Sequence, residues 1–299
     1  QRDGHGDYFL EGDDDYFWCV ETREYCPEDE GHYCEVRGVT ILGDGDDCDY
    51  CRCGGGDCVG RYHSCGDRVS LFSGRSGWLV GFEVEKNSVG DADSEGDYVG
   101  ETDLFAGWET DSSCGIEGVT HAYDPLDPHI VERFKAHVAG ARTELAAPAD
   151  RTCGGHINLS CDRLASFDLM DRFRRYAGLW YAVYRLRLNN GYCNVDKKME
   201  GTGDKYCPVR RRAFGIEVRL PSRVGNADVL LNRFEWVGLT CTAIDEGDSF
   251  AAYCRRCMPI LVTAYRGDRA KIASILRLAR QFNRYLQDGI IHPSIQQWV

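Results

Sequence analysis

The sequence feature that most restricts how this chain can fold is a set of short polar motifs on three expected strands. Residues 81–85 read GFEVE, residues 155–158 read GHIN, and residues 214–219 read FGIEVR. The polar residues of each motif stand two positions apart, so on a strand their side chains point to one face of the sheet. Buried strands rarely place charged residues inward. The sequence therefore predicts a sheet face that collects carboxylates, an imidazole, an amide and a guanidinium, an assembly suited to metal ions and a polyphosphate.

The remaining pattern predicts the elements around these motifs. Residues 78–86, 115–121, 152–159 and 213–220 are rich in β-branched or aromatic residues and bounded by Gly, Pro or Asp, which is typical of strands. Helices are expected at residues 129–146, from 166 or 168 to 188, 228–243, 250–265 and 268–288. Strands mixed with helices, without strict alternation, predict an α+β fold in which helices back an antiparallel sheet.

The first quarter of the chain differs in composition from the rest. Residues 1–70 hold 18 acidic and 6 basic residues and 8 of the 16 cysteines, whereas the remaining 229 residues are nearly neutral. This shift predicts two domains, a small acidic Cys-rich module at residues 1–72 and a catalytic domain at residues 73–299. The acid excess disfavours nucleic-acid binding by the module and leaves it as a candidate surface for a protein partner or a homo-oligomer.

The N-terminal cysteines have two interpretations. Cys48 and Cys51 form a C-x₂-C pair, the spacing with which two thiolates bind one Zn²⁺, and Cys34 and Cys65 complete our candidate zinc set. The pairing stays open, because Cys53 stands only two residues after Cys51. In an oxidising compartment the same residues would form disulfides. A small acidic module with few large apolar residues needs one or the other to stay folded.

The ends and apolar segments of the chain bear on its location. The first residues, QRDGH, include no apolar segment, which predicts no signal peptide and favours zinc over disulfides and a cytoplasmic location. Disulfides would instead indicate an extracellular or virion protein. No apolar run is long enough to span a bilayer, so no membrane is expected as a partner. A second C-x₂-C pair, Cys254 and Cys257, is interpreted as two semi-buried free thiols.

Each strand motif also has an ordinary interpretation. Glu83 and Glu85 could be the solvated side of a strand, Glu217 and Arg219 a simple ion pair, and His156 a hydrogen-bonded core residue. Their joint occurrence, each motif with a Gly before its polar residues, favours a common site. Gly at such positions permits close approach of another backbone or a ligand.

The order of these motifs resembles a known family. E-x-E, then D-x-S…G-x-E at residues 111–117, then H-x-N, then E-x-R is similar to the carboxylate–amine ligase superfamily, which has a glutamine-synthetase-like fold. The chain looks most similar to the amidoligases of bacteria and phages. The resemblance covers roughly residues 76–290 and leaves the Cys-rich module outside it.

The resemblance implies an ATP-dependent ligase that forms an amide bond through an acyl phosphate. It implies Glu83, Glu85, Glu117, Glu217 and His156 as Mg²⁺ ligands. It implies His156, Asn158 and Arg219 as nucleotide contacts, and Asp111 and Arg219 as catalytic residues. Just before the E-x-R strand, one of Arg210, Arg211 and Arg212 is expected to add a phosphate contact, with Arg210 as the candidate nucleotide contact and Arg212 as the candidate catalytic residue. Asn158 departs from the second histidine common in the family, although an amide can still donate to a phosphate oxygen. The expected substrates carry an amino group and a carboxylate and are small molecules, peptides or proteins.

Two other hypotheses remain. The chain could be a binding or structural protein on a degenerate ligase scaffold, which the Asn at position 158 permits. It could instead be a disulfide-rich extracellular or virion protein whose charged strands are ordinary. Mg²⁺-dependent ATP hydrolysis that is lost in Glu83→Ala would favour the ligase, which would work in the cytoplasm, or the host cytoplasm if phage-encoded.

Overall fold

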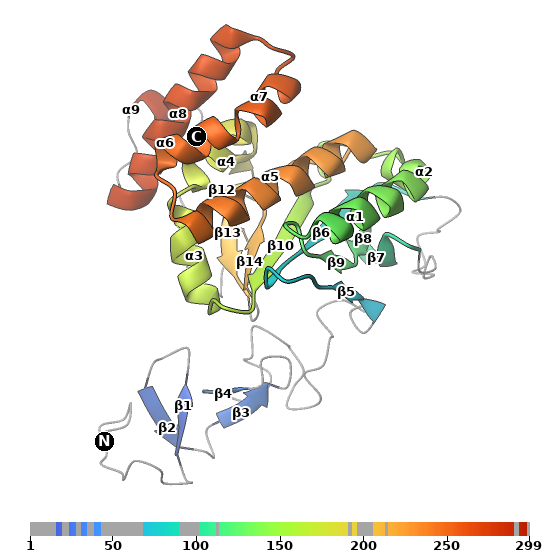
Figure 1. Ribbon diagram of the computed structural model, residues 1–299, viewed down its shortest axis with the longest axis vertical. Coiled ribbons are helices and arrows are strands. Elements are labelled where there is room, and N and C mark those ends of the chain that lie inside the picture. The colour runs from blue at the N-terminus through green and yellow to red at the C-terminus, as the bar shows by residue number, and fades with distance from the viewer. Residues whose placement is uncertain are drawn as a thin grey trace. The chain divides into compact units, whose positions relative to one another are not determined.

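The computed structural model divides into two compact units, residues 1–67 and 68–299 (Figure 1). In the larger unit it describes residues 68–89, 102–111, 114–190, 193–195, 206–212, 215–289 and 293–297. In the smaller unit it describes four strands, for which only the backbone is considered. β1 (Tyr16–Cys19) pairs antiparallel with β2 (Glu24–Pro27), and β3 (Gly31–Cys34) pairs antiparallel with β4 (Val39–Leu42).

The four candidate zinc ligands belong to the smaller unit. Cys48, Cys51 and Cys65 lie outside the described residues, as does the side chain of Cys34, whose backbone ends β3. Zinc and disulfides therefore both stay predictions.

An eight-stranded sheet forms the centre of the larger unit. Its main path runs β13 (Val209–Arg211), β14 (Gly215–Val218), β10 (Gly155–Cys161), β6 (Trp78–Lys86), β8 (Gly115–Thr120) and β7 (Phe105–Asp111), all antiparallel. β5 (Leu71–Phe72) and β9 (Ala122–Tyr123) pair in parallel beside β6. A mixed fold with helices and a largely antiparallel sheet is thus confirmed. The larger unit starts at residue 68 and includes β5, whereas the sequence suggests residue 73.

Helices cover one face of this sheet. α1 (Pro128–Gly140), α3 (Ser166–Arg174) and α5 (Ala227–Glu246) lie against its strands, and α1 runs beside α5 (Figure 1). The Phe82 ring of β6 lies 5.9 Å from that of Phe134 on α1, which stacks at 3.9 Å on Phe234 of α5. Because successive side chains of a strand point to opposite faces, Glu83 points away from these helices.

A second group of helices packs beyond one end of the sheet (Figure 1). It comprises α4 (Ala177–Val183), α6 (Phe250–Arg256), α7 (Met258–Ala264), α8 (Arg269–Asp288) and α9 (Pro293–Gln296). The hydroxyl of Tyr253 accepts hydrogen bonds from the indoles of Trp180 and Trp236, at 3.1 and 2.8 Å. A Cβ on Gly178 would lie 2.5 Å from the carbonyl oxygen of Ala279, so glycine lets α4 and α8 approach closely.

Three predicted helices are shorter than expected. The helix expected at residues 129–146 breaks into α1 and α2 (Arg142–Leu145). The helix expected at residues 250–265 breaks between α6 and α7, where Pro259 is the second residue of α7. The helix expected to reach residue 188 breaks into α3, α4 and the 3₁₀ helix η3 (Arg185–Arg187). At this break Tyr176 donates hydrogen bonds to the carbonyls of Ala243 and Asp248, both at 2.8 Å. Long-range contacts therefore overrode the helical pattern. At the start of α8, Oδ1 of Asp268 accepts a hydrogen bond from the backbone N–H of Lys271 at 3.0 Å and so caps the helix.

In the described part of the larger unit, free and buried cysteines stand at positions 153, 161, 193, 241, 254 and 257. Burial raises the pKa of Cys254 to about 11 and that of Cys257 to about 12, so both remain thiols at neutral pH. The two are free as predicted but more fully buried. Separately, no helix in the described ranges combines the length and apolar character needed to cross a membrane.

Candidate functional site

Strand register brings the predicted motifs together on the face of the sheet opposite the helices. His156 of β10 stands directly opposite Glu83 of β6, and Asn158 stands opposite Glu217 of β14. On the other side of β6, Glu117 of β8 stands opposite Glu85. Residues that stand directly opposite one another share a face. The register therefore makes one polar face from segments that lie more than 130 residues apart in the chain.

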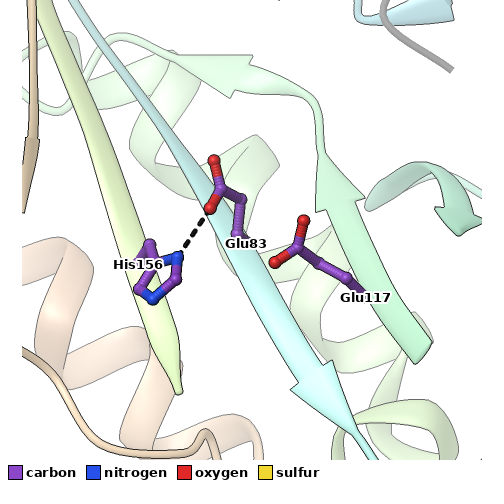
Figure 2. A group of neighbouring side chains, drawn as sticks. All are labelled: Glu83, Glu117 and His156. Carbon is purple, nitrogen blue, oxygen red and sulfur yellow. Dashed lines mark hydrogen bonds and ion pairs between the residues drawn. The ribbon is translucent and has the colours of Figure 1, made fainter. Parts of the chain in front are cut away.

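Three of these residues form a group with the geometry of a metal site. Glu83, Glu117 and His156 each offer one ligand atom, and these atoms all lie within 4.8 Å of one another. Figure 2 shows the three side chains on neighbouring strands, pointing to the same side. All three are buried, with exposed fractions of 2, 8 and 5%. A group of this kind can hold a divalent cation through two carboxylates and an imidazole.

Hydrogen bonds fix the central carboxylate of this group. Nδ1 of His156 lies 2.7 Å from Oε2 of Glu83, and because a carboxylate only accepts, Nδ1 is the donor. Nδ2 of Asn158 donates to Oε1 of the same carboxylate at 2.8 Å. Asn158, predicted to contact the nucleotide, thus orients Glu83 in this structure.

Carboxylates also line up across three neighbouring strands. Glu85 of β6, Glu117 of β8 and Glu109 of β7 occupy successive opposite positions. Like charges placed directly opposite one another destabilise a sheet. Glu85 is partly compensated, because its Oε2 accepts a hydrogen bond from the backbone N–H of Gly154. A cation on this row would offset the repulsion, which supports the metal interpretation.

Arginines surround the fourth predicted metal carboxylate, Glu217. Its Oε2 lies 2.5 Å from a terminal nitrogen of Arg212 and 3.5 Å from Nε of Arg210, and its Oε1 accepts from Arg219. Burial alone would raise the pKa of Glu217, but Arg212 and Arg219 outweigh this, and the net pKa lies below its usual value. Glu217 therefore lies on the basic side of the site and holds guanidinium groups in place.

A further arginine, which sequence reasoning missed, reaches the acidic side. Nη1 of Arg187, on η3, donates to the carbonyl of Cys153 at 3.2 Å, and Nη2 lies 3.2 Å from where a Cβ on Gly154 would stand. Burial lowers the pKa of Arg187, and the nearby Glu85 carboxylate offsets part of this. Nε of Arg187, like Nε of Arg210, is buried without a hydrogen-bond partner. The sequence carries no signal for this role, because Arg187 stands in a segment expected to be helical.

The glycine that precedes each motif is required, or not, by its own surroundings. A Cβ on Gly155 would lie 2.4 Å from Nη1 of Arg233 on α5, and one on Gly215 would lie 2.0 Å from the carbonyl oxygen of Leu159. Both positions require the close approach that the sequence predicts. At Gly81 the nearest atoms would be 3.9 Å away, so no contact accounts for glycine there.

The structure does not describe the side chain of Asp111, one of the predicted catalytic residues, whose backbone ends β7. The other charged residues that the sequence predicts form two zones, an acidic one on β6 and β8 and a basic one beside β13 and β14, where Arg210 lies on β13 and Arg212 and Arg219 follow β13 and β14. No family model matches the chain, and no curated protein matches it.

Proposed function

We propose that the polar face of the sheet binds Mg²⁺ and ATP and catalyses amide-bond formation between a carboxylate and an amine, as in the glutamine-synthetase-like ligases that the motifs resemble. The observation that carries the proposal is the meeting of Glu83, Glu117 and His156 beside the arginines around Glu217. A cation-binding group next to buried guanidinium groups is the arrangement that a metal-bound polyphosphate requires.

The charges favour one orientation of the nucleotide. Glu83 and Glu117, with His156, would hold the cation, since carboxylate oxygens are the ligands that Mg²⁺ prefers. Arg210 and Arg219 would contact phosphate oxygens, because a guanidinium presents two parallel donors to them. The buried Nε of Arg210, which lacks a hydrogen bond in this structure, is consistent with such a contact.

The chemistry requires activation because a carboxylate is a poor electrophile. An oxygen of the substrate carboxylate attacks the γ-phosphorus of ATP, the bond to the bridging oxygen breaks, and ADP leaves. The amine nitrogen then attacks the acyl carbon, phosphate departs, and the nitrogen loses a proton. The bound cation supplies charge neutralisation. The arginines position the phosphates and stabilise developing charge, and Asp111 is the proposed proton acceptor.

A second function uses the same face without catalysis. Glu217 is paired with arginines, and Glu83 already accepts from His156 and Asn158. These mutual contacts would also stabilise a ligase scaffold that only binds a nucleotide or serves a structural role. ATP hydrolysis separates the two functions, because the ligase should release ADP when substrate or water accepts the phosphoryl group.

Calorimetric titration with ATP, with and without Mg²⁺, tests the shared requirement. We expect binding to depend on Mg²⁺ and to weaken roughly tenfold or more in Glu117→Gln, since a charged contact contributes about 1.5–3 kcal/mol. Glu132→Gln is the matched control, because Glu132 pairs with Lys135 on the exposed side of α1. Unchanged ATP affinity in Glu117→Gln and Glu83→Gln would refute the proposed site.

A further inference from the structure

A cavity away from the sheet has a different chemistry. It has a volume of about 390 Å³ and lies between α8 and η3. Arg185, Lys271 and Arg277 contribute cationic groups to its lining, and Ile275 and Leu278 contribute apolar surface. The described residues that line it include no acidic side chain. The volume falls within the range of small-molecule sites, roughly 300–1,000 Å³.

The helix that forms one wall, α8, is strongly basic. α8 contains five basic residues, at positions 269, 271, 277, 280 and 284, and no acidic residue before Asp288. Arg277 and Arg280, and then Arg280 and Arg284, stand three and four positions apart, where like charges repel on a helix surface. The whole chain nevertheless has a net charge of −13. A concentration of positive charge on such a chain, beside a cavity, points to an anionic ligand.

We propose that this cavity binds a small phosphorylated organic molecule. Three cationic side chains line it, and a dianionic phosphate compensates more of their charge than a single carboxylate does. Arg185 and Arg277 present planar donor forks that match phosphate oxygens, and Lys271 adds a point charge. Ser274 and Gln281 add uncharged polar groups to the lining. The apolar strip of Ile275 and Leu278 would contact the organic part of the ligand.

The position of Lys271 supports this interpretation. Its ammonium lies 5.2 Å from the centroid of the Tyr265 ring, an aromatic face that restrains this cation. Nη1 of Arg185 donates to the carbonyl of Ala182 at 3.2 Å, which restrains the guanidinium group. Two of the three cations are therefore held by contacts with the surrounding helices. The inference uses none of the residues assigned to the ligase site.

Titration with phenyl phosphate tests the proposal, using the full chain without added metal or nucleotide. We expect saturable binding in calorimetry that weakens about tenfold in Arg277→Gln and in Lys271→Gln, since each removes a charged contact. Both residues are exposed, so circular dichroism should show an unchanged fold. Arg284→Gln, an exposed arginine on the same helix outside the cavity lining, should change the affinity less than about twofold.

Two further arms decide the outcome. Phenylacetate, which carries a carboxylate in place of the phosphate, should bind at least about tenfold more weakly. Glu117→Gln should bind phenyl phosphate as the unmodified chain does, which separates this site from the proposed ligase site. Absence of binding, equal affinity for phenylacetate, or an equal loss in Arg284→Gln would overturn the proposal.

Discussion

Replacing Glu217 with Gln isolates the electrostatic balance at the basic side of the polar face. Glu217 is fully buried, and its two oxygens lie against the guanidinium groups of Arg210, Arg212 and Arg219. Gln keeps the size of the side chain but removes its charge. Removing one partner of a buried ion pair costs about 3–5 kcal/mol, because the remaining charge stays buried and uncompensated. We expect a loss of this size in the free energy of unfolding.

Urea unfolding followed by tryptophan fluorescence measures this loss, because the larger unit buries Trp78, Trp108, Trp180 and Trp236. In thermal unfolding the same loss corresponds to a decrease in Tm of roughly 6–20 °C, from about 2–4 °C per kcal/mol for a domain of this size. Glu132→Gln removes an exposed carboxylate 2.7 Å from Lys135 and should change stability by less than about 0.5 kcal/mol.

The pH dependence of the free energy of unfolding is a second test of the contacts between Glu217 and its arginines. The pKa of Glu217 is lower in the folded chain than its usual value, so its ionisation stabilises the fold. That contribution is complete above the usual glutamic acid pKa and disappears as the pH falls through the lower, folded value. The difference between the original chain and Glu217→Gln should therefore shrink on acidification. A loss below about 1 kcal/mol at neutral pH would refute the reasoning, because buried arginines cannot lose such a partner cheaply.

Three further outcomes follow from buried groups of the larger unit. Lys86 is fully buried, donates to three backbone carbonyls, and has its pKa lowered by burial to about 8. Between this pKa and the usual lysine value, the folded chain therefore binds fewer protons than the unfolded chain. Its free energy of unfolding, measured in urea, should rise by about 3 kcal/mol between pH 8 and 10.5 relative to that of Lys86→Met. Parallel pH profiles of the two chains would contradict this. Tyr253→Phe leaves the indole donors of Trp180 and Trp236 without their acceptor. It should lower the free energy of unfolding by about 2–5 kcal/mol in the same assay. A decrease below about 1 kcal/mol would show that other acceptors replace the hydroxyl. Arg187→Gln should weaken binding of Mg²⁺-ATP in calorimetry while the circular dichroism spectrum is unchanged, and full affinity would exclude Arg187 from the site.

The strands were the most predictable part of the fold. β6 spans the predicted residues 78–86, because it is rich in β-branched and aromatic residues and alternates apolar with polar side chains from Phe82 to Glu85. β7 and β13 were missed. β7 contains a glycine and ends in acidic residues, and β13 is only three residues long, so neither carries a clear period of two. Their pairing depends on neighbouring strands rather than on their own sequences.

The candidate site was predictable in its members but not in its contacts. The period-two spacing of Glu83 with Glu85 and of His156 with Asn158 places each pair on one face whatever the rest of the fold does. Strand order and register decide which groups then meet, and these are long-range properties. Glu217 therefore contacts arginines, although its predicted role is metal binding. Arg187 was beyond sequence reasoning, since its place near Glu85 results from the break after α3.

Crystals soaked with Mn²⁺ and a non-hydrolysable ATP analogue give the most direct test of the proposed ligase site. Anomalous diffraction would locate the manganese ion without reference to the protein phases. We expect an anomalous peak coordinated by Glu83, Glu117 and His156, with the phosphates of the analogue against Arg210 and Arg219. A peak elsewhere, or a nucleotide bound on another surface, would contradict the assignment of this polar face.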